Sequence, residues 1–216
     1  HLSHEGLDLE KPSLEPQYNK PGFLKLGVSP EQAPDTPTYV TIHFEKGIPT
    51  AVDGKEMESV AEYLGKSVLR EVDEDEFMKN IADIRSSCGD RAVLRAMHFY
   101  GDNARVEKQA AALKAGDFET FKKYIIESGR SSYMYNQNVY SCKKASEQPV
   151  SLALSLSEKL LDGCGAWRVH GGGFAGTIQA FVPLNKLDEY KDLMEKVFGS
   201  GSCYILSVRP VGGVEL

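Results

Sequence analysis

The sequence has few of the features that mark membrane-spanning or nucleic-acid-binding chains. No run of apolar residues approaches the roughly 18 needed to cross a bilayer, so we expect no membrane partner. Asp and Glu outnumber Lys and Arg by 31 to 25, which gives a formal charge of -6. Because each neutralised phosphate requires a Lys or Arg, this balance argues against a nucleic-acid partner.

Cysteine is also scarce, and its spacing excludes two common kinds of site. The cysteines at 88, 142, 164 and 203 are widely separated and form no C-x-x-C pair, so neither a zinc site nor a redox motif is indicated. Buried free thiols in a reducing compartment are the simplest interpretation. The first residues have neither the basic start nor the apolar core of a signal peptide. We therefore predict a cytoplasmic protein without a bound metal.

Proline is concentrated at one end of the chain. Seven of the ten prolines precede residue 58, and each fixes its own φ and removes a backbone donor. Long helices are excluded from this stretch. Its one regular signal is a β-rich run over residues 39–45, a turn at Lys46-Gly47 and a second run over residues 48–52. This pattern predicts a β-hairpin, in which Pro49 must lie at an edge or at a strand start.

From Glu58 onward the apolar residues recur at helical spacing. One helical face is formed by Ala61, Leu64 and Val68, and a second, after the turn-like segment 88–90, by Val93, Met97, Tyr100 and Ala104. Gly116 is expected to stop the second helix. Asp117 can cap a helix over residues 118–128, with Gly129 after its end. A further helix is predicted over residues 149–161.

The last part of the chain alternates strands and helices. We predict strands over residues 166–169 and 177–182, a helix over 184–198 and a strand over 204–208. Because a short glycine loop, residues 170–176, joins the first two strands, they should be antiparallel neighbours. The predicted fold class is therefore α+β, an antiparallel sheet with helices packed on one face.

The glycine loop fits the spacing G-x-G-x-x-G from Gly171 to Gly176. A dinucleotide-binding fold needs a helix after such a loop, and here a β-rich segment follows instead. The protein-kinase version needs a strand lysine, an H-R-D segment and a D-F-G segment, which this sequence lacks. Consecutive glycines leave backbone N–H groups open to an anion, which favours a phosphate contact. The alternative is a tight hairpin whose glycines serve only positive φ or close packing.

The segment from Gly165 to Pro183 resembles the third motif of galactokinases, which belong to the GHMP family of small-molecule kinases. Further matching segments are Leu94-Arg-Ala-Met-His98, the run from Asp102 to Glu107, Gly116 to Phe121, Glu127 to Ser132, Gln137 to Ser141 and Arg209 to Gly213. At the position of Asp102 many relatives have a glutamate. The resemblance covers residues 58–216 and implies the C-terminal domain of a GHMP kinase.

This resemblance implies a role beside nucleotide phosphates for the loop residues Gly171, Gly172, Gly173, Phe174 and Gly176. It also implies ATP and Mg²⁺ as cofactors and galactose as a substrate. His170 could donate to a phosphate, although a structural turn histidine is the alternative. Arg168 on the preceding strand has the simpler interpretation of an ordinary ion-pair or surface residue.

The catalytic residues remain unassigned. The sugar-gripping segment, the P-G-R-x-N-L-I-G-E-H type motif, the serine-rich phosphate loop and the catalytic aspartate of galactokinases are not found in these 216 residues. Phosphoryl transfer needs a triphosphate cradle, a metal and a group at the attacking hydroxyl. We therefore expect these residues to be inactive as a kinase by themselves.

Residues 1–57 resemble a different family, namely an internal fragment of argininosuccinate synthase. The similar segments are residues 1–10, 26–37 and 40–49. Two partial resemblances that meet near Met57 suggest a fusion of unrelated pieces, with a Pro-rich segment at 1–57 and a galactokinase C-terminal-like domain at 58–216. An apolar face left uncovered would favour self-association, so a homodimer is expected. The alternative function is a non-catalytic scaffold or self-associating interaction protein.

Overall fold

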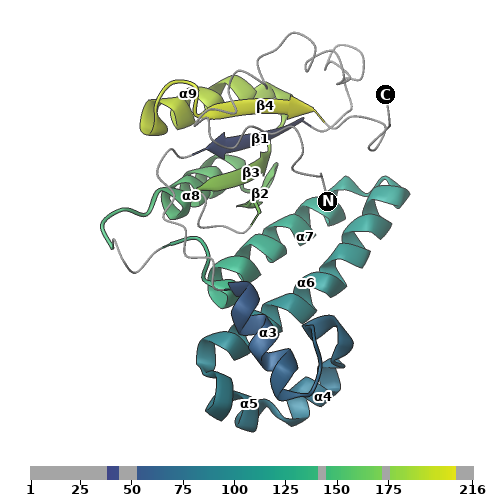
Figure 1. Ribbon diagram of the computed structural model, residues 1–216. Coiled ribbons are helices and arrows are strands. Elements are labelled where there is room, and N and C mark those ends of the chain that lie inside the picture. The colour runs from purple at the N-terminus through teal and green to yellow at the C-terminus, as the bar shows by residue number, and fades with distance from the viewer. Residues whose placement is uncertain (1–37, 44–52, 141–144, 172–175, 208–216) are drawn as a thin grey trace, which may run out of the picture. The chain divides into compact units, whose positions relative to one another are not determined.

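A computed structural model describes residues 38–43, 53–140, 145–171 and 176–207 of the chain (Figure 1). The chain divides into two compact units, one formed by Tyr39–Leu206 and the other by His1–Thr38 together with Ser207–Leu216. The first unit contains nearly all of the described residues, including every helix named below.

The first helical region surrounds a core of its own. Its elements are α3 (Asp53–Tyr63), η1 (Leu69–Glu71), α4 (Glu74–Lys79), α5 (Ile81–Cys88) and the long α6 (Asp90–Ala115). Val60, Ala61, Phe77 and Ile84 are fully buried in this core. The predicted face Ala61–Leu64–Val68 is wrong at its end, because α3 stops at Tyr63 and Val68 is 51% exposed in extended backbone.

Helices α6 and α7 (Phe118–Ser131) form an antiparallel hairpin whose turn follows the predicted chemistry. Gly116 lies in the left-handed region, with φ 69°, where glycine has no Cβ penalty. The Asp117 side chain accepts a hydrogen bond from the backbone N–H of Thr120 at 3.0 Å. The end predicted at Gly129 for the helix over residues 118–128 is wrong, because α7 continues to Ser131 and then into the π-helical turn η2 (Ser132–Asn136).

The sheet has four strands in the order β2-β3-β1-β4. Their bounds are β1 Thr38–His43, β2 Ala166–Val169, β3 Thr177–Phe181 and β4 Cys203–Ser207. As predicted, β2 and β3 are antiparallel neighbours, with Arg168 opposite Gln179. The strand predicted near Tyr39 is confirmed, but its neighbours are β3 and β4 rather than a hairpin partner. The second strand of that predicted hairpin, residues 48–52, lies outside the described residues.

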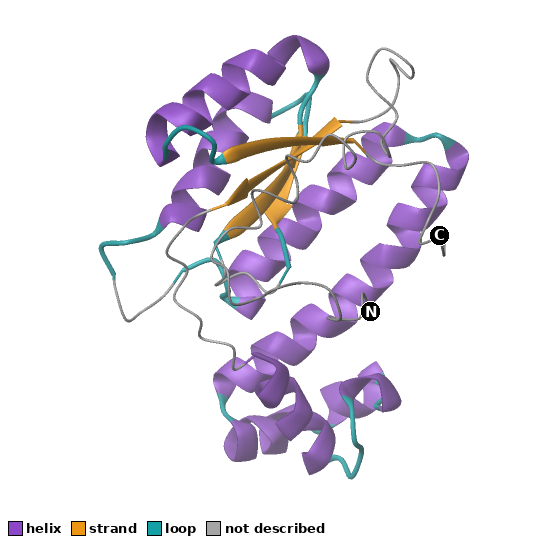
Figure 2. Cartoon of the chain, turned by 45° about the horizontal axis from the view of Figure 1, so that its top comes forward, coloured by secondary structure: helices purple, strands orange, loops and turns teal. Residues whose placement is uncertain are grey.

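Two further helices cover the sheet. They are α8 (Pro149–Leu161) and α9 (Leu187–Phe198), the latter preceded by the short η3 (Leu184–Lys186). Trp167 and Val169 of β2 share the core that includes Leu154 of α8 and Met194 of α9. Ala166, at an alternate position of β2, packs instead with Phe121 of α7. Figure 2 shows the strands with helices on both sides, so β2 lies between α8 and α7.

The arrangement confirms the α+β class with an antiparallel sheet and packed helices. The helices lie on both faces of the sheet rather than on one, because alternate residues of β2 pack against α8 and against α7. Within the described ranges, no helix combines the length and the apolarity that crossing a bilayer requires. The division of the chain at residue 57 into two domains stays a prediction.

Candidate functional site at the glycine loop

The glycine loop joins β2 to β3 at one end of the sheet. The first and last glycines of the loop have positive φ, 64° at Gly171 and 83° at Gly176, and such values favour glycine. The hairpin closes because the N–H of His170 donates to the carbonyl of Thr177 at 3.0 Å. The Thr177 hydroxyl donates in return to the carbonyl of His170 at 3.3 Å. Left-handed residues occur in the backbone nests that bind anions, and the loop residues between these two glycines lie outside the described residues.

The structure places only part of the predicted phosphate-binding set. Gly171 and Gly176 are described, whereas Gly172, Gly173 and Phe174 lie outside the described residues. A Cβ added at Gly171 would meet nothing within 4 Å. Its φ, rather than crowding, is therefore what selects glycine at this position.

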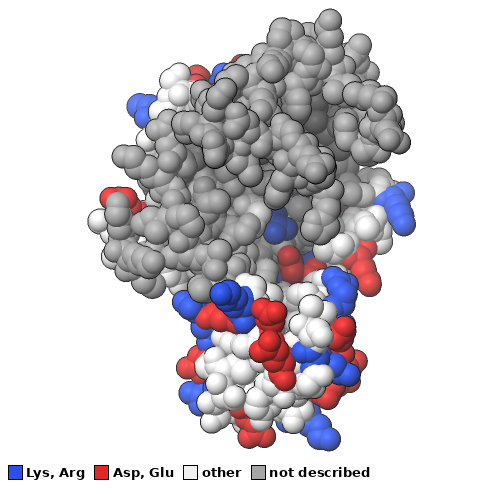
Figure 3. Space-filling model, viewed as in Figure 1, with Lys and Arg blue, Asp and Glu red and all other residues white. Residues whose placement is uncertain are grey.

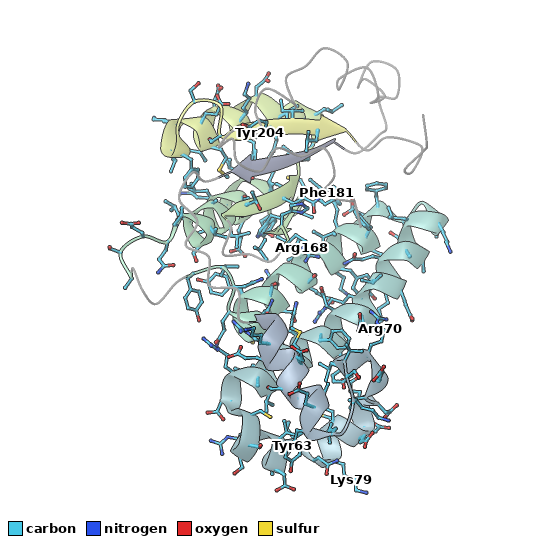
Figure 4. All side chains as sticks on the ribbon, viewed as in Figure 1. Tyr63, Arg70, Lys79, Arg168, Phe181 and Tyr204 are labelled. Carbon is cyan, nitrogen blue, oxygen red and sulfur yellow. The ribbon has the colours of Figure 1, made fainter. Side chains whose placement is uncertain are left out.

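Two basic residues lead into the loop. His170 is exposed, yet partial burial of its ring lowers the pKa of the imidazole, and the positive charge of Arg168 lowers it further. At neutral pH the ring is therefore neutral, and it can donate a hydrogen bond from one nitrogen without adding positive charge. Arg168 is half-buried on β2 beside α7 (Figure 4). Its Nε donates to the carbonyl of Val169 at 3.1 Å, which holds the side chain along the strand.

Behind this strand, α6 and α7 share a partly buried polar network that the sequence did not reveal. Asp102 accepts hydrogen bonds from the Ser128 hydroxyl at 2.6 Å and from Arg105 at 3.1 Å. His98 lies one helical turn before Asp102, and its Nδ1 is 3.0 Å from the Ser131 hydroxyl. Spacings of three and four residues along each helix place these groups on facing sides, and this is the signal that could have found them.

The network acts on the loop strand through electrostatics. Burial lowers the pKa of the Arg168 guanidinium, the Asp102 carboxylate opposes that change and Arg105 adds to it. Since Ser131 and His98 are both buried, no substrate can reach the Ser–His–Asp grouping as it stands. We interpret it as packing chemistry between α6 and α7 rather than as a nucleophile site.

Gly129 explains how α7 comes so close to β2. A Cβ at this position would lie 3.0 Å from the Cβ of Arg168 and 3.1 Å from the carbonyl oxygen of Trp167. A glycine inside the helix therefore allows the helix to touch the strand backbone directly. The sequence pattern suggested a helix end here, whereas the packing shows a close approach.

The described part of the chain contains no group of three or more His, Cys, Asp or Glu side chains suited to hold a metal ion. On the face shown in Figure 3, acidic and basic side chains alternate over the described helical region, without an extended patch of one sign. The described residues therefore offer backbone and guanidinium groups to an anion, but no ready-made metal site.

Comparisons with known proteins give a sequence match for the N-terminal part of the chain and a fold match for most of the chain. The family described as Arginosuccinate synthase C-terminal domain matches residues 1–72. The argininosuccinate synthase of Acetivibrio thermocellus is 70% identical over 56 residues, which are 26% of this chain and 13% of that protein. That of Moorella thermoacetica is 59% identical over 63 residues, or 28% of this chain and 14% of that protein. The N-terminal part is thus similar to a short stretch of these enzymes, and the match runs past the boundary expected at residue 57.

The fold has a different relative. A crystal structure of Lactococcus lactis galactokinase complexed with galactose matches with a TM-score of 0.58 and 19% identity, covering 81% of this chain and 45% of that one. A likeness at this identity shows the fold. The described residues therefore have a galactokinase-like α+β fold, and they correspond to less than half of that enzyme's length.

Proposed function

We propose that residues 58–216 form a galactokinase-like lobe that holds the phosphate side of ATP at the glycine loop. The observation that carries this proposal is the hairpin itself, whose glycines have positive φ at both ends of the loop in a galactokinase-like fold. Backbone N–H groups of the loop would receive the phosphate oxygens, as in an anion-binding nest. The neutral His170 would stand at its base.

The magnesium ion would reach this site with the nucleotide. Mg²⁺ usually keeps several waters and is held by one or two carboxylates together with substrate phosphates. The described residues offer no cluster of carboxylates to hold it. We propose that this lobe alone does not transfer phosphate to galactose, because the groups that would orient the sugar hydroxyl are not among its motifs.

A nucleotide titration tests the binding step. Mg-ATP at about 100 times its dissociation constant should raise the free energy of unfolding by roughly 2.7 kcal/mol, seen as a higher melting temperature. Absence of any thermal shift at millimolar Mg-ATP would contradict the proposal.

Two glycines provide a matched pair of variants. Gly171 and Gly163 both have positive φ, 64° and 74°, and a Cβ added at either position would lie in open space. Replacing either by Ala should cost about 1 to 2 kcal/mol of stability, because both backbones are left-handed. Only Gly171→Ala should also weaken the ATP response, since Gly163 lies at the end of α8. Equal loss in both variants would assign the glycines to folding alone.

Turnover is a separate question. With Mg-ATP and galactose, ADP release from residues 1–216 should not exceed the background without sugar. A clear galactose-dependent rate would contradict the expectation that this lobe is inactive alone.

A second function, self-association as a scaffold, is favoured by one surface of α6. Val106 and Leu113 are 58% and 47% exposed and lie two helical turns apart on the same side. Sedimentation velocity should then show a concentration-dependent dimer that Val106→Glu weakens. A dimer without any ATP response would favour this function over nucleotide binding.

A further inference from the structure

A cavity of about 310 Å³ lies at the outer edge of β2, and the described loop residues Gly171 and Gly176 are not among the residues that line it. The cavity exists because β2 is an edge strand of the sheet, and α7 and α8 pack on its opposite faces. Its apolar walls come from all three elements and the adjoining π-helical turn: Ile126, Tyr133, Met134, Leu154 and Trp167. The volume is at the lower end of the range for small-molecule sites.

The residues at the bottom of the cavity are buried, and those at its opening are exposed to solvent. Trp167 is only 7% exposed, whereas Tyr133 and Met134 are 43% and 61% exposed. Gly129, which also lines the cavity, contributes no side chain to fill it. A flat or branched apolar group could therefore enter from solvent and cover the tryptophan without rearranging the core.

The charges around the cavity do not balance. Two arginines and one glutamate line it, namely Arg130, Arg168 and Glu158. Arg130 and Glu158 form an exposed ion pair at 3.4 Å. No other residue of the lining matches the charge of Arg168, and the nearby Asp102 carboxylate is already paired with Arg105. Its Nε is engaged by the Val169 carbonyl, and its partial burial makes the guanidinium poorly solvated. An anionic group on a ligand would compensate that charge.

We propose that this cavity binds a small organic anion with an aromatic or branched apolar body, its anionic end toward Arg168 and its body against Trp167. The complementarity is both of shape and of charge, since the cavity has an apolar floor and its lining carries one more cation than anion. The proposal does not depend on the role of the glycine loop, because the cavity residues and the loop residues are different groups.

The chain carries its own reporter for this site. Trp167 is the single tryptophan of the sequence, so its fluorescence reports on the cavity. We would titrate the full chain with 3-phenylpropionate, 3-phenylpropan-1-ol and 3-phenylpropylamine, which share one apolar body and differ in charge. The anion should change the fluorescence saturably and bind about tenfold or more tightly than the alcohol, because hydrogen bonds to charged groups are the stronger ones. The amine should bind more weakly still.

Two variants locate the binding. Ser155 is exposed on α8 and lines the cavity, so Ser155→Phe should fill it and abolish saturable binding of 3-phenylpropionate. Arg168→Gln should remove the preference for the anion and leave the alcohol's affinity unchanged. Arg85→Gln, which removes an exposed charge on α5, is the control and should change neither. Circular dichroism and melting temperatures would verify that each variant is folded.

Several outcomes would overturn the inference. These are a linear, unsaturable response to 3-phenylpropionate, equal affinity for the amine and the anion, or unchanged binding in folded Ser155→Phe. Repeating the titration with Mg-ATP separates the two proposals. Binding of 3-phenylpropionate should persist whether or not ATP produces a thermal shift.

Discussion

At the residue scale, two glycines that lie inside helices differ in what surrounds them. One faces the backbone of a strand, and the other faces a flexible side chain. Gly129 faces the backbone of β2, and a Cβ added to it would lie 3.1 Å from the carbonyl oxygen of Trp167. Gly101 in α6 faces only the end of the Arg105 side chain, at 3.3 Å. A backbone atom cannot move aside without shifting the strand, whereas a long flexible side chain can.

The first prediction follows from this contrast. Gly129→Ala should lower the free energy of unfolding by about 1 to 3 kcal/mol through overpacking against β2. Gly101→Ala should be neutral or stabilising by up to about 1 kcal/mol, because Ala is the better helix former. Urea denaturation followed by circular dichroism measures both. Similar effects from both substitutions would mean that α7 does not approach β2 as closely as described.

The second prediction concerns the cap of α7. The hydrogen bonds from Thr120 lower the pKa of the Asp117 carboxyl below its usual 3.8. A lowered folded pKa means that the carboxylate stabilises the protein above its unfolded pKa and loses that effect as pH falls through the folded value. Asp117→Ala should therefore reduce the melting temperature by about 2 to 4 °C at pH 7, and the difference should narrow below pH 4.

Asp162 offers the matched control for that cap. It is exposed just after α8, and replacing it by Ala changes the net charge equally. If Asp162→Ala reproduced both the size and the pH dependence of the Asp117 effect, general charge rather than capping would be responsible.

At the scale of elements, an ion pair joins α3 to α6. Arg95 is 1% exposed, and its guanidinium bonds the Glu56 carboxylate of α3 and the carbonyl of Asn136 in η2. Glu56 also accepts from Arg91 at 2.7 Å. Glu56 lies within the residues that match argininosuccinate synthase, whereas Arg95 lies beyond them. The two parts of the chain therefore share one set of contacts.

The third prediction tests that pair. Glu56→Ala should cost about 3 kcal/mol, because it leaves a buried guanidinium without its anion. Arg91→Gln removes an exposed partner of the same carboxylate and should cost less than about 1 kcal/mol. Chemical denaturation measures both free energies of unfolding. A cost for Glu56→Ala no larger than that for Arg91→Gln would contradict a buried pair.

At the scale of the whole Tyr39–Leu206 unit, the decisive feature is the place of β1. This strand lies between β3 and β4, with Thr41 opposite Gln179. It precedes every other strand by more than 100 residues and falls within the part that resembles argininosuccinate synthase. An interior position of the galactokinase-like sheet is therefore occupied by a strand from the part that matches argininosuccinate synthase.

The fourth prediction follows from that central position. Thr41→Pro removes a ladder hydrogen bond and leaves a carbonyl of a neighbouring strand without its donor, which should cost about 1 to 3 kcal/mol or more. Thr41→Val keeps the branched side chain and the N–H, and it should have little effect. Thermal unfolding followed through Trp167 in β2 is the measurement. An unchanged transition in Thr41→Pro would place β1 outside the sheet.

Sequence by itself determined the parts that depend on near neighbours. Gly116 and Asp117 set the turn between α6 and α7 because left-handed φ and capping are local properties. The short loop made β2 and β3 antiparallel neighbours for the same reason. The galactokinase-like fold and the synthase-like segment were likewise readable from consecutive residues.

Tertiary structure decided what depends on residues distant in the chain. The sequence predicts a helix end at Gly129, whereas in the structure this glycine lies inside α7 against the backbone of β2. The sequence also predicts that β1 is half of a hairpin, whereas in the structure β3 and β4 pair with its two edges. The Asp102 network and the cavity at Trp167 arise only where α6, α7, α8 and β2 meet. Backbone hydrogen bonds and side-chain contacts between such segments depend on global packing, which no local pattern encodes.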